Sequence, residues 1–408
     1  MWNSVTGEAV QREDHLLRIQ ERAEAFIREL ELEPPPSPAL GWSCSYVPQE
    51  LILAAGLTPV RIPTHVEEAR EQTQSYLPPN LCPYVHRLLQ AGLSRGLTHL
   101  QGTVFVSSCD PMRRLADIWE LYSRHRFLYR MEMPRREDRP ALEFFLRVLE
   151  NFRLSLQDLT GRKILAEDLR RAVTVLNRTR RIMRELDLLR AMPRSAITSA
   201  QLQRIALCAE SMSRERFNEM GAAFLSRIRR DLLRECRALP GMRQTRLFLA
   251  GCVVEDDGLH RLIEEAGARV VADSLCSGMR HFRGQVEENA ASPLEAVAAR
   301  YLHRLKCPRM VGRGERVRAL VSQARKSYSD GVVLHTLTFC DLHQMEVPAQ
   351  QEALREANIP CLHLEREHLS GEDAGQLRTR VQAFTELLSC RNKGLSVAAT
   401  SAGRNSNG

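Results

Sequence analysis

The chain has 408 residues, 43% hydrophobic and 26% charged, which is typical of a globular protein of roughly two or three domains. The net charge of +8 permits a nucleic-acid partner, but aromatic residues are only 5% and acidic residues interrupt the basic ones, so we expect none. No apolar run approaches the ~18 residues that span a bilayer, and the N-terminus lacks the apolar core of a secretory signal. We therefore expect a cytoplasmic protein without a membrane partner.

The first third of the chain is predicted to form an N-terminal extension and an α/β domain. Apolar residues recur at helical spacing over residues 11–31, and a proline run at 34–38 ends the helix. Residues 1–40 are therefore assigned to a helix and a linker. Residues 41–139 alternate helices with strands, and the pattern of a buried strand is strongest at 100–108.

The remaining chain is predicted to contain a helical segment, a second α/β domain and a tail. Residues 140–240 are almost wholly helical in pattern, and strand–helix alternation returns over residues 241–392. Residues 393–408 lack apolar content and are expected to be disordered. Strands that alternate with helices are typical of parallel sheets. The sequence therefore predicts an α/β fold with two parallel-sheet domains, a helical middle segment and an N-terminal helix.

Six of the eleven cysteines occur at loops, or where an apolar run meets turn or helix-start residues. These six are Cys44, Cys82, Cys109, Cys276, Cys307 and Cys340. Parallel α/β sheets collect ligand sites outside the carboxyl ends of their strands, which is where such motifs lie. Thiolate sulfur suits iron–sulfur clusters, zinc or copper(I). We interpret the pattern as an iron–sulfur site that the fold assembles from distant segments.

Three of the six show the same arrangement, a strand or loop followed by the cysteine and then by a helix start. They are Cys44, Cys109 and Cys340. A helix N-terminus favours a thiolate or an anionic cluster. The sequence contains no CxxC pair, which disfavours a zinc ribbon or a ferredoxin-type site. The alternative to a metal site is that these cysteines are ordinary buried residues.

The other five cysteines are predicted to be core residues rather than ligands. They lie in helical or strand-like stretches: Cys208, Cys236, Cys252, Cys361 and Cys390. In a reducing cytoplasm we expect no disulfide framework.

Glu50, on the helix that follows Cys44, is the predicted catalytic residue. If that helix directs its N-terminus toward the site, the carboxylate can transfer a proton at the substrate. The alternative is a first-turn glutamate that complements the helix dipole.

Seven segments, in order and over about residues 41–390, carry a family resemblance. They are GWSCSYVPQELILAAGLTPVRI, YLPPNLCPYVHRLL, VFVSSCDPMRRLADIW, EEAGARVVADSLCSGMRHF, RYLHRLKCPRM, DGVVLHTLTFCD and GQLRTRVQAFTELL. In these segments the chain resembles the 2-hydroxyacyl-CoA dehydratase family, which includes benzoyl-CoA reductase subunits and double-cubane cluster proteins.

The resemblance implies two flavodoxin- or Rossmann-like domains and a 4Fe–4S cubane held by Cys44, Cys109 and Cys340 where they meet. It implies a homologous sister subunit, or a second copy of the chain, as partner. It also implies an ATP-dependent iron–sulfur activator that delivers one low-potential electron to an acyl-CoA thioester, for ketyl-radical dehydration or for reduction. GxGxxG and P-loop motifs are absent from the sequence, so ATP use is assigned to the activator.

Two alternatives to this function stay open. In double-cubane proteins a second set of cysteines holds a second cubane, giving an 8Fe cluster that reduces small molecules. Cys82, Cys276 and Cys307 stand where that second set would be. The other alternative is a non-catalytic electron-transfer or scaffold subunit that positions a catalytic sister chain.

Overall fold

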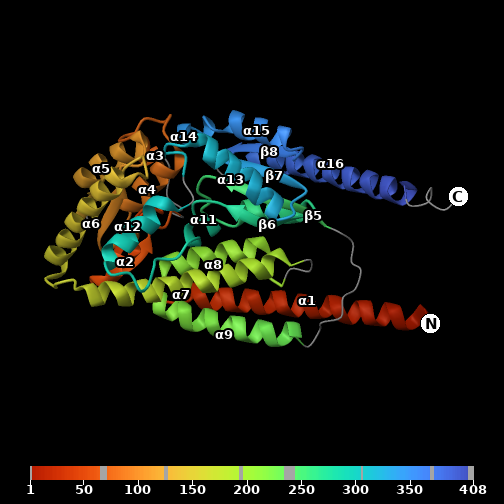
Figure 1. The fold of residues 1–408 in the computed structure, drawn as a ribbon, viewed down its shortest axis with the longest axis horizontal. Helices are drawn as coiled ribbons and strands as arrows, with labels where there is room; N and C mark the ends of the chain where they lie inside the picture. The colour runs from red at the N-terminus through yellow and green to blue at the C-terminus, as the bar shows by residue number, and fades with distance from the viewer. Residues whose placement is uncertain are drawn as a thin grey trace.

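The fold consists of two four-stranded parallel sheets and a layer of long helices that contacts both (Figure 1). The computed structural model describes residues 2–64, 71–123, 127–192, 196–233, 244–304, 307–367 and 372–402. The predicted fold class, α/β with two parallel-sheet domains, is confirmed.

The first sheet has the strand order β2-β1-β3-β4. Its strands are β1 (Ala39–Trp42), β2 (Thr58–Arg61), β3 (Leu100–Val106) and β4 (Phe127–Met131). The connecting helices are α2 (Gln49–Ala54), α3 (Glu71–Gln74), α4 (Pro83–Leu93), the 3-10 turn η1 (Arg95–Leu97) and α5 (Asp110–Tyr122). The sequence predicts β2 and β3 but not β1 and β4, because runs of four and five residues carry little periodicity.

The second sheet has the equivalent order, β6-β5-β7-β8. Its strands, all predicted from the sequence, are β5 (Thr245–Gly251), β6 (Ala268–Ser274), β7 (Gly331–Leu337) and β8 (Cys361–Arg366). Its helices are α10 (Gly258–Glu265), α11 (Met279–Phe282), α12 (Pro293–His303), α13 (Arg313–Lys326), α14 (Asp341–Gln344), α15 (Val347–Glu356) and α16 (Glu372–Ala402). In such sheets ligands bind where the strand order reverses, here between β1 and β3 and between β5 and β7.

The described residues of the predicted helical segment form four helices. They are α6 (Arg139–Thr160), α7 (Ala166–Ala191), α8 (Ser199–Ser211) and α9 (Arg214–Leu233). Asp138 starts α6 by accepting a hydrogen bond from the Ala141 N–H at 3.1 Å, and Gly161 ends it in the left-handed region at φ 66°.

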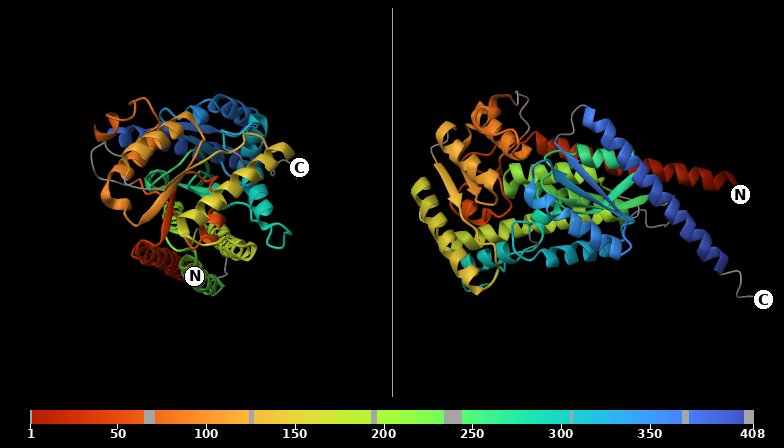
Figure 2. Two further views of the ribbon diagram at one scale, coloured as in Figure 1. Left: turned by 90° about the vertical axis from the view of Figure 1, so that its left-hand side faces the viewer. Right: turned by 90° about the horizontal axis from the view of Figure 1, so that it is seen from above.

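The helical layer holds the two sheets together. Helix α7 packs on α2 and β6, α8 packs on β2 and β6, and α1 (Trp2–Glu31) lies along α8 and α9 (Figure 2). A buried ion pair of 2.7 Å joins Arg190 of α7 to Asp273 of β6. The two sheets are also interlocked, because Val297 and Tyr301 of α12 belong to the hydrophobic core of the first sheet.

Helix α16 continues through residues 393–402 of the predicted tail, and residues 403–408 lie outside the described residues, so disorder of the tail stays a prediction. A lack of apolar side chains removes burial as a reason to fold. A helix that is already formed nevertheless propagates easily through alanine-containing sequence without proline. Helices α1 and α16 project from the body toward the same side (Figure 1). Within the described residues, no helix has the length and apolar composition to cross a bilayer.

The end of β5 approaches β7 so closely that only glycine fits at position 251. A Cβ on Gly251 would lie 1.9 Å from the His335 carbonyl oxygen, and the φ of 153° also disfavours a side chain. We expect Gly251→Ala to lower the free energy of unfolding by at least about 2 kcal/mol, because backbone must move. Gly375→Ala is the matched control, since Gly375 is exposed in α16 with open space around it. Thermal or urea unfolding checks this, and equal stability of the two variants would contradict it.

Candidate functional site

The predicted cysteines lie at the carboxyl ends of both sheets or beside helix starts. Cys44 follows β1, Cys109 follows β3, Cys276 follows β6 and Cys340 follows β7, while Cys82 precedes α4 and Cys307 precedes α13. The structure brings all six thiols into one region, where they affect one another electrostatically.

Three of the thiols belong to residues that directly precede a helix, and we call them the Cys82 set. Cys82, Cys109 and Cys340 are the N-cap residues of α4, α5 and α14. The Cys82 thiol neighbours that of Cys340, and this neighbour, with burial, raises the pKa of Cys340. Burial raises the pKa of Cys109 to about 11, and Cys340 contributes to that increase.

The other three thiols, which we call the Cys44 set, are Cys44, Cys276 and Cys307, and their turns are linked directly. The Ser45 hydroxyl donates to the Cys276 carbonyl at 2.8 Å, and the Tyr46 hydroxyl accepts from the Cys307 N–H at 3.2 Å. Burial raises the pKa of Cys307 to about 12, and the nearby Cys276 and Cys44 thiolates contribute.

The two sets adjoin, but their contacts divide the cysteines differently from the predicted grouping. Cys340 lies near Cys82 and is also affected by Cys276, whereas Cys44 shares its neighbourhood with Cys276 and Cys307, so Cys276 lies between the two sets. Cys109 is affected by both Cys340 and, less strongly, Cys44. That Cys44, Cys109 and Cys340 hold one cluster therefore stays a prediction, and the contacts favour Cys82 in place of Cys44.

Three buried arginines surround the Cys44 set. Arg280 donates to Cys276 Sγ at 2.7 Å, and Arg304 donates to the Ser45 and Arg280 carbonyls at 2.5 and 2.8 Å. Arg309 donates to the Met133 and Pro134 carbonyls, at 2.9 and 3.1 Å. They are only 7%, 8% and 4% exposed, and none pairs with a carboxylate of the described residues. Buried charge is costly without a counter-charge, so an anion bound beside these arginines would be stabilised.

The sequence analysis did not identify these three arginines as functional. The available signal was proximity in sequence, because each lies within four residues of Cys276 or Cys307.

The donor set fits an iron–sulfur cluster better than a single metal ion. Among the described residues, no three His, Cys, Asp or Glu side chains are close enough to ligate one ion. A cubane instead takes each thiolate on a different iron, which allows wider spacing, and it carries net negative charge. Iron would offset the repulsion between the thiolates, and the cluster would supply the anion that the arginines lack.

A third group, not predicted as functional, lies beside both sets. Cys252 Sγ is 3.4 Å from His335 Nδ1, and Arg366 donates to His335 Nε2 at 2.6 Å. Because Arg366 occupies Nε2, His335 carries its proton on Nδ1 and donates it to Cys252. The Cys252 N–H binds the His335 carbonyl at 3.2 Å, and its own carbonyl accepts from Cys276. Cys252 is buried, as predicted, but it abuts the site.

The turn before Cys340 is strained. Phe339 adopts a φ of 58°, in the left-handed region, and its side chain is 42% exposed. A bulky residue in this conformation costs roughly 1–2 kcal/mol, and such strain is concentrated at functional sites.

The remaining cysteines are away from these contacts. Cys208 and Cys361 are half-buried, and Cys236 lies outside the described residues. Cys390 is exposed on α16, so its assignment to the core is wrong. The sequence pattern around Cys390 correctly predicts a helix, but it does not show that Cys390 lies on the exposed face of that helix.

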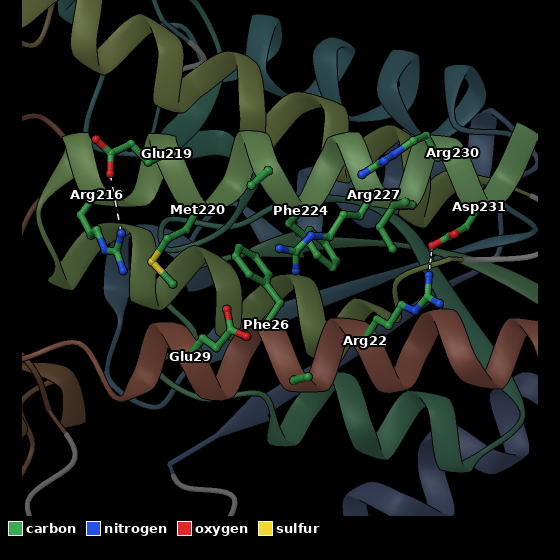
Figure 3. A pocket seen from close by; sticks show the side chains of 13 residues that line it. Arg22, Phe26, Glu29, Arg216, Glu219, Met220, Phe224, Arg227, Arg230 and Asp231 are labelled. Atoms are coloured by element: carbon green, nitrogen blue, oxygen red, sulfur yellow. Dashed lines mark hydrogen bonds and ion pairs between the residues drawn. The ribbon is translucent and has the colours of Figure 1, made fainter.

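A groove of about 740 Å³ lies between α1 and α9, and Figure 3 shows its lining. Phe26 and Phe224, which line the groove, stack with ring centroids 4.2 Å apart. The ion pair between Arg22 of α1 and Asp231 of α9 joins its two sides. None of the predicted site residues lines it.

Glu50 is buried inside the protein and paired. Its carboxylate accepts hydrogen bonds from Arg180 at 2.6 Å and from the Tyr301 hydroxyl at 2.9 Å. Burial opposes ionisation, but the Arg180 guanidinium prevails and lowers the pKa of Glu50. These contacts join α2 to α7 and α12, and a catalytic role for Glu50 stays a prediction.

We expect Glu50→Gln to lower the free energy of unfolding by roughly 3–5 kcal/mol, because Arg180 is left as an unpaired buried charge. Since folding lowers the pKa of Glu50, the stabilisation is present at neutral pH and is lost as the pH falls below about 4. Urea unfolding at several pH values measures both effects. The control is Glu143→Gln, an exposed partner of Arg139, with an expected change within about 0.5 kcal/mol. Lost turnover with unchanged stability would instead identify Glu50 as catalytic.

Comparison with known proteins gives a consistent result. The family model described as 2-hydroxyglutaryl-CoA dehydratase, D-component, matches residues 44–388. The beta subunit of (R)-phenyllactyl-CoA dehydratase from Clostridium sporogenes is 24% identical over 86% of this chain and 91% of its own length. A benzoyl-CoA reductase subunit from Thauera aromatica is 24% identical, with coverages of 83% and 87%. The beta subunit of (R)-2-hydroxyglutaryl-CoA dehydratase from Acidaminococcus fermentans is 20% identical, with coverages of 86% and 92%.

Proposed function

Because this chain belongs to the 2-hydroxyglutaryl-CoA dehydratase D-component family, we propose that it is the iron–sulfur subunit of a 2-hydroxyacyl-CoA dehydratase or benzoyl-CoA reductase type enzyme. The observation that carries the proposal is the convergence of six thiols from both sheets beside three buried arginines without carboxylate partners among the described residues. The relatives named above are themselves subunits of dehydratases and reductases, which supports a sister subunit as partner.

Under this proposal Cys82, Cys109 and Cys340 hold a 4Fe–4S cubane, and Cys44, Cys276 and Cys307 can hold a second. When bound, such a group supplies one low-potential electron at a time and a Lewis-acidic iron. The electron comes from an ATP-dependent activator protein and is used on a CoA thioester, for ketyl-radical dehydration or for reduction. The chain would work in the cytoplasm, under anaerobic conditions.

The protein's own residues prepare the site for this chemistry. The N-cap positions of Cys109 and Cys340 place their sulfurs beside the first backbone N–H groups of α5 and α14, and this positive end of a helix favours a thiolate. The buried hydrophobic cluster around Cys82, with Leu337, Met112 and Val253, excludes water from one side. Arg280 holds the Cys276 sulfur in place.

A double-cubane reductase of small molecules is the second candidate function. The contacts within the Cys44 set favour it, since these three thiols have their own linked turns and their own positive charges. A non-catalytic electron-transfer or scaffold role is the remaining alternative.

Iron and sulfide analysis after anaerobic reconstitution distinguishes one cubane from two, with about four or about eight irons per chain. If both sets are filled, Cys82→Ser and Cys109→Ser should remove one spectroscopic signal, and Cys44→Ser and Cys276→Ser should remove the other. Cys208→Ser is the control and should retain all iron. If Cys44→Ser and Cys109→Ser remove the same signal while Cys82→Ser does not, the grouping predicted from the sequence is correct. The grouping proposed from the contacts in the structure is then wrong.

Catalysis is tested with the chain, its sister subunit, the reduced activator and ATP. We expect a 2-hydroxyacyl-CoA to lose water, measured as enoyl-CoA by chromatography, and Cys109→Ser to abolish the reaction. Binding of the CoA ester to the iron-loaded chain, measured by calorimetry, separates the roles. A chain with full iron content that binds no CoA ester would favour the scaffold alternative.

A further inference from the structure

The two sets of thiols are stabilised by different kinds of positive charge. At the Cys82 set the positive charge comes mainly from the helix starts that follow the three cysteines, and a whole helix N-terminus amounts to roughly half an elementary charge. Arg87 lies near Cys82, but its guanidinium forms an ion pair with Glu255. Arg366 is directed at His335. Among the described residues, no guanidinium donates to the sulfur of Cys82, Cys109 or Cys340, although Arg366 is buried and carries its full charge nearby.

The Cys44 set instead faces whole charges. Arg280 contacts the Cys276 sulfur directly at 2.7 Å, and the guanidinium groups of Arg304 and Arg309 each lie 5.6 Å from the centre of the Tyr46 ring, next to Cys44. The Arg309 backbone N–H also donates to Cys307 Sγ, at 3.5 Å. Their burial keeps these charges unscreened by water, and no carboxylate of the described residues pairs with them.

Adding an electron to an iron–sulfur group increases its negative charge. A nearby buried cation stabilises the reduced form more than the oxidised form and so raises the reduction potential. Partial charges and hydrogen bonds act in the same direction but more weakly. The two sets should therefore differ in potential, and the difference has a fixed sign.

We infer that the Cys44 set binds the more easily reduced of two iron–sulfur groups, and that Arg280 raises its potential. The inference rests on the proposed function in its two-cubane form. It gives Arg280 a role as a charge-compensating residue that touches the ligand sulfur of Cys276. Of two groups in one chain, the first electron to arrive would reside at the Cys44 set.

The test is a reductive titration of the reconstituted full-length chain, followed by electron paramagnetic resonance. Wild type should show two one-electron steps. Cys276→Ser should remove the step at higher potential, and Cys109→Ser the step at lower potential. Arg280→Gln should move the upper step to lower potential, whereas Arg280→Lys, which keeps the charge, should leave it near the wild-type value. Arg114→Gln, an exposed residue of α5, is the control and should move neither step.

Several results would overturn the inference. They are an unchanged upper step in Arg280→Gln, a shift confined to the lower step, or removal of the lower step by Cys276→Ser. If Arg280→Gln does not retain iron, Arg304→Gln replaces it. Loss of iron from both variants would make the arginines assembly residues and would also overturn it.

Iron content separates this inference from the function on which it rests. About four irons per chain, removed by Cys109→Ser but not by Cys276→Ser, would leave the single-cubane function intact and overturn the inference. A chain that binds no iron at all would overturn both.

Discussion

The whole site depends on three buried arginines that pair with no carboxylate of the described residues. The guanidinium groups of Arg280, Arg304 and Arg309 donate hydrogen bonds to main-chain carbonyls and to one thiol. These bonds stabilise the turns that carry Cys44, Cys276 and Cys307. Carbonyl dipoles solvate a guanidinium, but they do not cancel its charge. The protein therefore folds around an excess of positive charge that thiolates and an anionic group can balance.

Several other interior arginines pair with carboxylates, whereas Arg214, Arg300 and Arg366 are buried and, among the described residues, donate to carbonyls, an amide or a histidine instead. Arg180 pairs with Glu50, Arg190 with Asp273, and Arg61 with Glu210. Each of these pairs joins the helical layer to one of the sheets. The layer thus fixes how the carboxyl ends of the two sheets face each other, and the site forms in the region between them.

Much of the fold could be predicted from the sequence because it depends on local pattern. Long apolar strands such as β3 and β7, and the helices of 140–240, have clear periodicity. The short strands β1 and β4 do not. The set of six cysteines was found because each adjoins a turn or a helix start. The sequence cannot show which thiols share a group, because that depends on packing between the sheets, as when Cys340 neighbours Cys82 across 258 positions of the sequence. The buried arginines escaped for the same reason.

The shared order of the two sheets has a consequence for the origin of the site. Cys44 and Cys252 follow the first strand of their respective sheets, and Cys109 and Cys340 follow the third. The site thus has the character of an interface between two related halves within a single polypeptide, each offering sulfur at matching places. On this view Cys252 is the internal counterpart of Cys44, and its partner is His335.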